Sequence, residues 1–234
     1  MKKSVFLLLI LVLSFGLMFG ASNDSNTYSV KSSFGGGISL LNNEDINSTF
    51  ADNNLPELKN PIFSMVNSSS FILDNRLALI MDSNVFMNLS GENDDYYNRF
   101  VGVTFTGGIG YNIDLGSLNI TPNFGLGIGS QIFFIQKKNI NSVEDVLATP
   151  GNSTILYSME VPLKVGFDLG FNINRNRHNT TNLILKTDYF FNIANLGWSN
   201  NITSMLPTFL ENNKIENKLE GLSIALMFEV KTDF

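Results

Sequence analysis

The chain has 234 residues, of which 15% are charged and 44% are hydrophobic, and its formal net charge is −6. This length fits one β-domain or two small ones, and the 19 glycines and 20 phenylalanines favour an all-β protein. The absence of cysteine excludes structural disulfides and a lipid anchor on a modified cysteine. The acidic balance, with no basic patch, argues against nucleic acid as a partner.

The first segment, residues 1–22, has the pattern of a cleaved secretory signal peptide. Lys2 and Lys3 precede an apolar run, and Gly20 and Ser22 suit the −3 and −1 positions of a cleavage site. A single N-terminal transmembrane anchor is the alternative, although the apolar run is short for a bilayer span. Cleavage would leave 13 basic and 21 acidic residues, and therefore a net charge of −8.

The rest of the chain alternates apolar and polar residues at period two, which is the pattern of β-strands with one apolar face. In the clearest run, Ser158–Phe171, seven consecutive apolar residues fall on one face, and a helix would scatter them around its axis. Within the third run, residues 82–84 ("DSN") could instead form a turn, so the sequence leaves open whether that strand is broken. The eight runs, in chain order, are Val30–Leu40, Phe63–Leu73, Leu77–Leu89, Val101–Ile113, Leu118–Phe134, Ser158–Phe171, Leu183–Ile193 and Leu222–Phe234.

The connections between these runs alternate between long and short. The long polar links are expected at about residues 42–61, 90–98, 135–153 and 195–218. The short links are expected near residues 74–76, 114–117 and 173–181. A chain that shuttles across a membrane produces such alternation, with long loops on one side and tight turns on the other.

The two faces of the runs differ in chemistry. One is rich in Gly, Ser, Thr and Asn, which suits the narrow interior of an eight-stranded barrel, and the other is a continuous apolar band, which suits lipid. The sequence therefore predicts an all-β fold over residues 23–234, an eight-stranded antiparallel up-and-down transmembrane β-barrel. A secreted soluble barrel of the lipocalin type is the alternative. Aromatic residues at the run ends fit interfacial girdles, and these are Tyr28, Phe134, Tyr157, Phe171, Tyr189 and Phe234.

The signal segment, the alternating runs, the alternating link lengths and the final Phe234 together resemble the small eight-stranded outer-membrane β-barrel proteins of bacteria, of the OmpA transmembrane-domain and OmpX type. The resemblance implies an outer-membrane location in a Gram-negative-type envelope, lipid as a partner, and both chain ends in the periplasm. It also implies biogenesis with periplasmic chaperones and the barrel-assembly machinery. In such families the last strand is the assembly signal, which Phe228, Val230 and Phe234 match and from which Thr232 departs. Full-length OmpA carries a peptidoglycan-binding domain after its barrel, and no such domain is expected after this strand.

Charged residues on the inward face of the sixth to eighth runs predict a salt-bridge network in the lumen, concentrated in its periplasmic half, because buried charges require partners. The network either supports the structure and closes the channel, or acts as an ion gate. Its expected members are Glu160, Lys164, Asp168, Lys186, Asp188, Glu229, Lys231 and, at the rim, Asp233. Inward glycines make room for large residues opposite, help the sheet to curve strongly, or line a small cavity. These glycines are Gly102, Gly108, Gly110, Gly125, Gly127 and Gly129.

No enzymatic activity, cofactor or metal is expected, because the single histidine, His178, lies in a predicted periplasmic turn with no cysteine or ligand cluster to work with. The function predicted is structural or loop-mediated surface binding and adhesion, to an extracellular ligand that the sequence does not identify. A narrow channel for ions or small solutes is the alternative. The candidate loop patch consists of Trp198, Met205, Leu206, Phe209 and Leu210.

Overall fold

The computed structural model describes residues 28–138, 153–175, 179–195 and 220–234. Most residues in these ranges belong to long β-strands, and one short helix, α2, interrupts the series. Among the described residues, no helix is long and apolar enough to cross a membrane. The elements are β1 (Tyr28–Leu41), α2 (Glu44–Asp52), β2 (Ile62–Leu73), β3 (Leu77–Glu92), β4 (Tyr96–Tyr111), β5 (Ile113–Asp114), β6 (Leu118–Lys137), β7 (Ser153–Arg175), β8 (Asn179–Asn195) and β9 (Gly221–Asp233).

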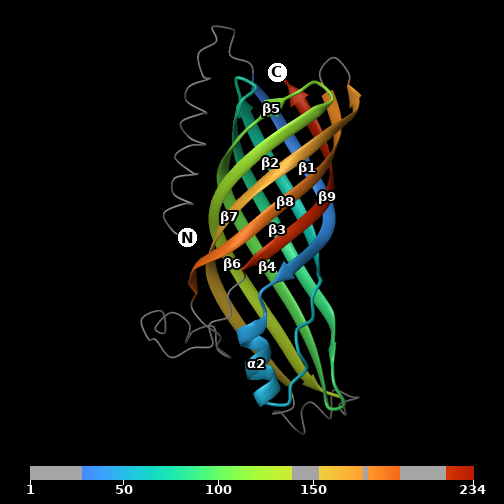
Figure 1. Ribbon diagram of the computed structural model, residues 1–234, viewed down its shortest axis with the longest axis vertical. Helices are drawn as coiled ribbons and strands as arrows, with labels where there is room; N and C mark the ends of the chain where they lie inside the picture. The colour runs from blue at the N-terminus through green and yellow to red at the C-terminus, as the bar shows by residue number, and fades with distance from the viewer. Residues whose placement is uncertain (1–27, 139–152, 176–178, 196–219) are drawn as a thin grey trace.

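Eight of these strands form a closed antiparallel ring, which confirms the predicted barrel (Figure 1). Each long strand pairs with the next along the chain, and the two-residue β5 pairs with β6 beside the end of β4. The ring closes where β1 meets β9 in antiparallel register, with Phe34 opposite Phe228. Closure leaves no free sheet edge, so the backbone groups of both terminal strands have partners.

The strand that the sequence left open is continuous. Residues 82–84 pair with both neighbours of β3, and Asp82 stands opposite Ser68 of β2 and Thr106 of β4. The alternative of a turn at residues 82–84 is therefore wrong. The triplet keeps strand alternation because Asp82 and Asn84 point into the barrel, where both side chains are buried and find polar partners.

The two ends of the barrel differ. At one end lie the tight connection 74–76, the turn after β5, and the C-terminus; at the other lies α2, inside the long connection 42–61 (Figure 1). The long link expected at 90–98 is wrong, because β3 and β4 stay paired out to Glu92 and Tyr97, and only residues 93–95 join them. This turn is tight because the side-chain oxygen of Asn93 accepts hydrogen bonds from the backbone N–H groups of Asp95 and Tyr96.

The distribution of side chains is the reverse of that in a water-soluble barrel. Large apolar side chains cover the outer face, where Phe34 is 56% and Phe228 is 66% exposed. The inner face holds buried polar and charged residues, among them Lys164, Lys186 and Glu160. The outward face predicted for each run matches this pattern, since alternation along a strand sends successive side chains to opposite faces.

Candidate functional site

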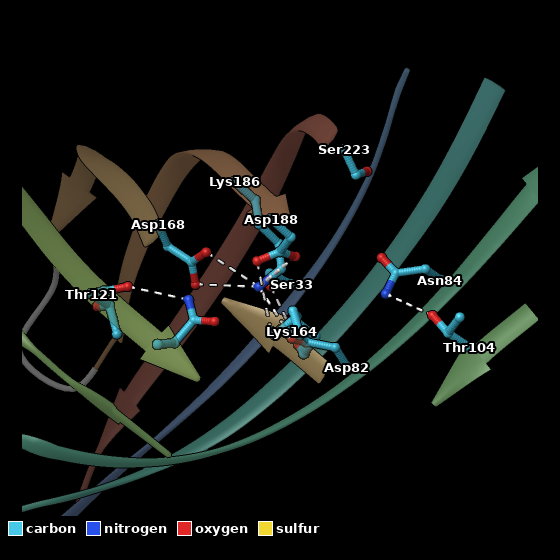
Figure 2. Close-up of polar contacts among 12 residues, drawn as sticks. Ser33, Asp82, Asn84, Thr104, Thr121, Lys164, Asp168, Lys186, Asp188 and Ser223 are labelled. Carbon is cyan, nitrogen blue, oxygen red and sulfur yellow. Dashed lines mark hydrogen bonds and ion pairs between the residues drawn. The ribbon is translucent and has the colours of Figure 1, made fainter. Parts of the chain in front are cut away.

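The centre of the lumen holds a cluster of five charged side chains, which Figure 2 shows pointing toward one another. Lys186 Nζ lies 3.2 Å from an oxygen of Asp168, 3.3 Å from one of Asp82 and 3.8 Å from one of Asp188. Lys164 forms an ion pair with Asp82 and lies 3.8 Å from Asp188. Four of these side chains are no more than 3% exposed, and only Asp168 is partly accessible.

The cluster joins strands that lie on opposite sides of the ring. Asp82 belongs to β3, whereas Lys164 and Lys186 belong to the adjacent strands β7 and β8. In the ring order, β3 is separated from β8 by four steps in either direction, so these ion pairs cross the lumen from wall to wall. A charge cluster in this position connects the two walls and occupies the space that a channel would need.

Asp82 is the central residue that sequence reasoning missed. Its "DSN" context was read as a possible turn, although a continuous strand would have placed it on the inward face with the other charges. Within the strands, Asp82 lies nearer the end of β3 that meets the tight connection 74–76, and Lys164 lies midway along β7. Lys231 stands apart from the cluster: it pairs with Asp233 at 2.9 Å near the rim.

Two further buried carboxylates extend the polar interior along the axis. Glu229 lies 3.6 Å from Lys31 and accepts a hydrogen bond of 2.7 Å from the amide of Asn182. Glu160, toward the α2 end, accepts hydrogen bonds from the side-chain amides of Gln131 and Asn192, at 3.0 and 2.9 Å. Amide donors from neighbouring strands thus replace water around charges that burial would otherwise destabilise.

Inward glycines stand beside the charged side chains. A Cβ built on Gly125 would lie 3.6 Å from Cε of Lys164, and one on Gly129 would lie 2.8 Å from Oε1 of Glu160. One built on Gly166 would overlap the carboxylate of Asp188. At these positions the structure favours room for larger side chains opposite. A Cβ on Gly108 or Gly127 would instead overlap the backbone of the neighbouring strand, which agrees with the interpretation that glycine permits strong curvature.

The α2 end of the lumen is filled by an apolar cluster that the sequence analysis did not predict. Phe100 and Phe133 have ring centroids 4.9 Å apart, and Phe50 of α2 meets Phe133 edge-on at 5.1 Å. A signal was available in the "FF" pairs at 133–134 and 190–191, because adjacent strand residues point to opposite faces and one ring of each pair must enter the lumen. The buried members are Leu41, Ile46, Phe50, Leu58, Ile62, Phe86, Phe100, Phe133, Ile135 and Phe190.

Asparagine side chains hold the segment after α2 against the barrel wall. Asn88 and Asn98, on β3 and β4, donate to the backbone carbonyls of Lys59 and Pro56, at 2.6 and 2.9 Å. Asn47 of α2 both donates to the carbonyl of Leu58 and accepts from its N–H, at 3.0 and 2.8 Å. These bonds and the buried side chains of α2 hold α2 and the segment that follows it, which together form a cap, over the mouth of the barrel.

A groove of about 670 Å³ opens between α2 and the segment that follows it. Its lining combines polar and apolar side chains from α2 and from both segments that flank it. The lining residues are Leu41, Asn42, Asn43, Glu44, Asn47, Ser48, Ala51, Glu57, Leu58, Lys59 and Asn60.

The residues expected to form the assembly signal lie on the outer face of the last strand and its end. Phe228, Val230 and Phe234 are all exposed. Phe234 stacks on Tyr28 with ring centroids 5.4 Å apart and an interplanar angle of 13°. Of the other expected girdle residues, Phe134, Phe171 and Tyr189 are exposed and Tyr157 is partly buried.

Three predictions lie outside the described residues: the signal peptide at 1–22, the lone histidine His178, and the loop patch of Trp198, Met205, Leu206, Phe209 and Leu210. Within the described ranges, no group of three or more His, Asp or Glu side chains is arranged to hold a metal ion.

No protein-family model matches the chain, and no curated protein matches it either. Solved structures do resemble it. Ail, the attachment invasion locus protein of Yersinia pestis, is 9% identical with a TM-score of 0.47, Neisserial surface protein A is 12% identical with a TM-score of 0.42, and a major outer membrane protein of Thermus thermophilus is 9% identical with a TM-score of 0.48. Each comparison covers 90% of this chain and 100% of the other.

Proposed function

We propose that the chain is an integral outer-membrane β-barrel with a closed lumen, which presents a fixed polar surface at its α2 end for binding outside the cell. The observation that carries the proposal is the reversed distribution of side chains, with an apolar outer face and ion pairs inside. In water the outer face would be a single apolar surface far larger than the few hundred Å² usual on soluble monomers. Lipid removes that cost, and the closed ring leaves no unpaired strand edge in hydrocarbon.

The length of the strands supports a wall that projects beyond the membrane. About 9–11 tilted residues suffice to cross the hydrocarbon core, whereas β6 has 20 residues and β7 has 23. The tight connection 74–76, the turn after β5 and the C-terminus lie at one end, which by resemblance faces the periplasm. The extra length then extends the α2 end into the medium, and rigid scaffolds commonly carry their binding surfaces there.

The filled lumen supports a structural role over a channel. The central ion pairs cross from wall to wall, and the apolar cluster with α2 blocks the mouth. A cavity beside Lys31 and Glu229 has a volume of about 10 Å³, which is room for about one water molecule. The centre of the lumen holds ion pairs and its α2 end is filled by packed apolar side chains, which disfavours an open lipocalin-like pocket for a soluble binding barrel.

Conductance tests the closed lumen directly. Planar-bilayer recordings of the wild-type protein and Lys186→Ala should both show no steady ion current, because the apolar cluster stays in place when the lysine is removed. A current in the wild-type protein, or one that the substitution opens, would support the gate instead. Liposome swelling checks the same point for small solutes.

Location is tested by fractionation and by gel migration. The detergent-extracted membrane fraction should contain a form whose migration changes on heating, as a closed barrel unfolds. A protein found only in the soluble fraction would contradict the proposal at its base.

Binding at the α2 end is tested with the purified protein on host matrix proteins and other envelope proteins. The matched variants are Glu44→Lys with Glu57→Lys, on the exposed side of the groove, and a deletion of residues 199–216. Asp114→Lys at the opposite end is the control, since Asp114 is also exposed. Loss of binding in either variant but not in the control would support surface binding, and no binding by any form would leave the structural role alone.

A further inference from the structure

On the outer face of the barrel, near its α2 end, we propose a binding site centred on Arg99 for an anionic phospholipid, whose phosphate is not neutralised by a cation of its own headgroup. The inference rests on the outer-membrane placement proposed above. The site is separate from both the lumen and the polar surface at the α2 end. It concerns a groove of about 300 Å³ on the side of β3, β4 and β6. The groove is lined by Leu89, Tyr97, Arg99, Val101, Phe134 and Gln136.

The alternation of the strands puts these side chains on the outward face. Arg99 stands opposite Phe134, and Tyr97 stands opposite Gln136, in the pairing of β4 with β6. Phe100, between Arg99 and Val101, points inward and is buried in the apolar cluster. The guanidinium is therefore carried on the same outer surface as the apolar band, rather than in the lumen with the other buried charges.

Arg99 differs from the inward cations in having no partner among the described residues. Lys31, Lys164 and Lys186 are each matched by a carboxylate inside the barrel. Lys138, a second cation of this rim, is also engaged, because its Nζ lies 3.4 Å from Glu92 and 5.1 Å from the ring centroid of Tyr97. The site thus combines one guanidinium that lacks a described counter-charge with a second cation over the adjacent aromatic ring.

The height of Arg99 fits the level of lipid headgroups. Tyr111 ends β4 at the opposite rim, and Arg99 lies 12 residues earlier on the same outward face. At about 3.3 Å per residue and a tilt near 45°, that separation spans about 28 Å, close to the thickness of the hydrocarbon core. Val101, two residues further along β4, and Phe134, opposite Arg99 on β6, offer apolar walls to an acyl chain.

The chemistry selects phosphate rather than a diffuse anionic surface. The guanidinium presents paired N–H donors that match two phosphate oxygens, and the Tyr97 hydroxyl and Gln136 amide add donors of the same groove. The chain as a whole is acidic, with a net charge of −6, and Asp94 and Asp95 lie at the neighbouring turn. General electrostatic attraction to anionic lipid is therefore unfavourable, so retention of such a lipid has to come from a local site.

The experiment measures lipid retained by the full-length, refolded protein. Nanodiscs are prepared from phosphatidylcholine alone or with phosphatidylglycerol of the same acyl chains, and the lipid that stays bound after release is counted by native mass spectrometry. We expect the wild-type protein to retain phosphatidylglycerol, and Arg99→Gln to retain about tenfold less at equal mole fraction. Val101→Trp, which keeps the arginine but fills the groove, should also reduce retention, whereas free inorganic phosphate should not displace the lipid.

The matched control is Arg175→Gln. Arg175 is also an exposed arginine at a strand end, at the opposite rim and without this groove. Equal loss in the two arginine variants, or equal retention by the wild-type protein and Arg99→Gln, would overturn the proposed site. Insertion is scored separately, by heat-modifiable migration from discs of phosphatidylcholine alone, so failure of the membrane placement is distinguished from failure of the lipid site.

Discussion

Replacing Lys186 by methionine tests the central ion cluster most sharply. The lysine is 2% exposed and lies within 4 Å of Asp82, Asp168 and Asp188. Methionine keeps an unbranched side chain but leaves three carboxylates with Lys164 as the remaining cation of the cluster. Removing one partner of a buried ion pair typically costs about 3–5 kcal/mol, because the charge that stays behind is neither hydrated nor paired. We expect Lys186→Met to lower the free energy of unfolding by about that amount.

The assay is urea unfolding of the barrel refolded in phosphatidylcholine vesicles, with the folded fraction read from unheated gel samples. Lys231→Met is the matched control, because Lys231 pairs at the rim with Asp233, whose side chain is 42% exposed. Pairs of this kind contribute about 0–1 kcal/mol. If the two variants lose equal stability, the argument for an essential buried cluster fails.

A second substitution separates charge imbalance from lost packing. Among the described residues, Lys186 is the only cation within 4 Å of Asp168. Adding Asp168→Asn to Lys186→Met therefore removes a carboxylate that has lost its partner, and should restore about 1–3 kcal/mol. A double variant no more stable than Lys186→Met would indicate that the loss comes from packing of the methylene stem.

Three further predictions use the same unfolding assay. Phe133→Ala should lower the free energy of unfolding by about 3–5 kcal/mol, because it opens a cavity in the buried cluster. Phe134 is 41% exposed, so Phe134→Ala should lower it much less, because lipid refills the space. Equal losses of stability would contradict the placement of the two rings. Gly166→Ala should lower the free energy of unfolding by about 1–3 kcal/mol, because the new Cβ would overlap Asp188. Gly107→Ala should be near neutral, because its Cβ would meet nothing within 4 Å. A larger loss of stability for Gly107→Ala than for Gly166→Ala would refute the fit of Gly166 to the charge cluster. Deleting Phe234 removes its stacked contact with Tyr28 and should lower the free energy of unfolding by about 0.5–1.5 kcal/mol. The same deletion should lower the amount of barrel inserted in cells several-fold. Loss of stability without loss of insertion would contradict a role of Phe234 in assembly.

Local patterning was enough to predict most of the barrel. Strand alternation is a property of neighbouring residues, so it identified eight strands and the outward face of each, including Phe34 and Phe228. It left residues 82–84 open between strand and turn, because local and long-range signals conflict there. A polar "DSN" triplet is a turn by composition, and only the lysines across the lumen make Asp82 an interior strand residue.

The α2 end shows the same limit in another form. Asn93 gives the β3–β4 connection a tight turn, and the strands continue through residues whose polarity indicated a loop. The helix α2 carries only two buried residues, Ile46 and Phe50, so its position depends on the rings and asparagine side chains of the barrel wall.

Local patterning predicts the number of long strands, the outward side of each and the presence of charges on the inner side, because period-two alternation needs no knowledge of distant residues. The tertiary structure decided which charges meet, since ring closure places β3 opposite β7 and β8 and brings Asp82 to Lys164 and Lys186. It also decided that the mouth is capped and that Arg99 faces outward beside a groove. These properties depend on which strands become neighbours or opposites around the ring, and no local pattern encodes that arrangement.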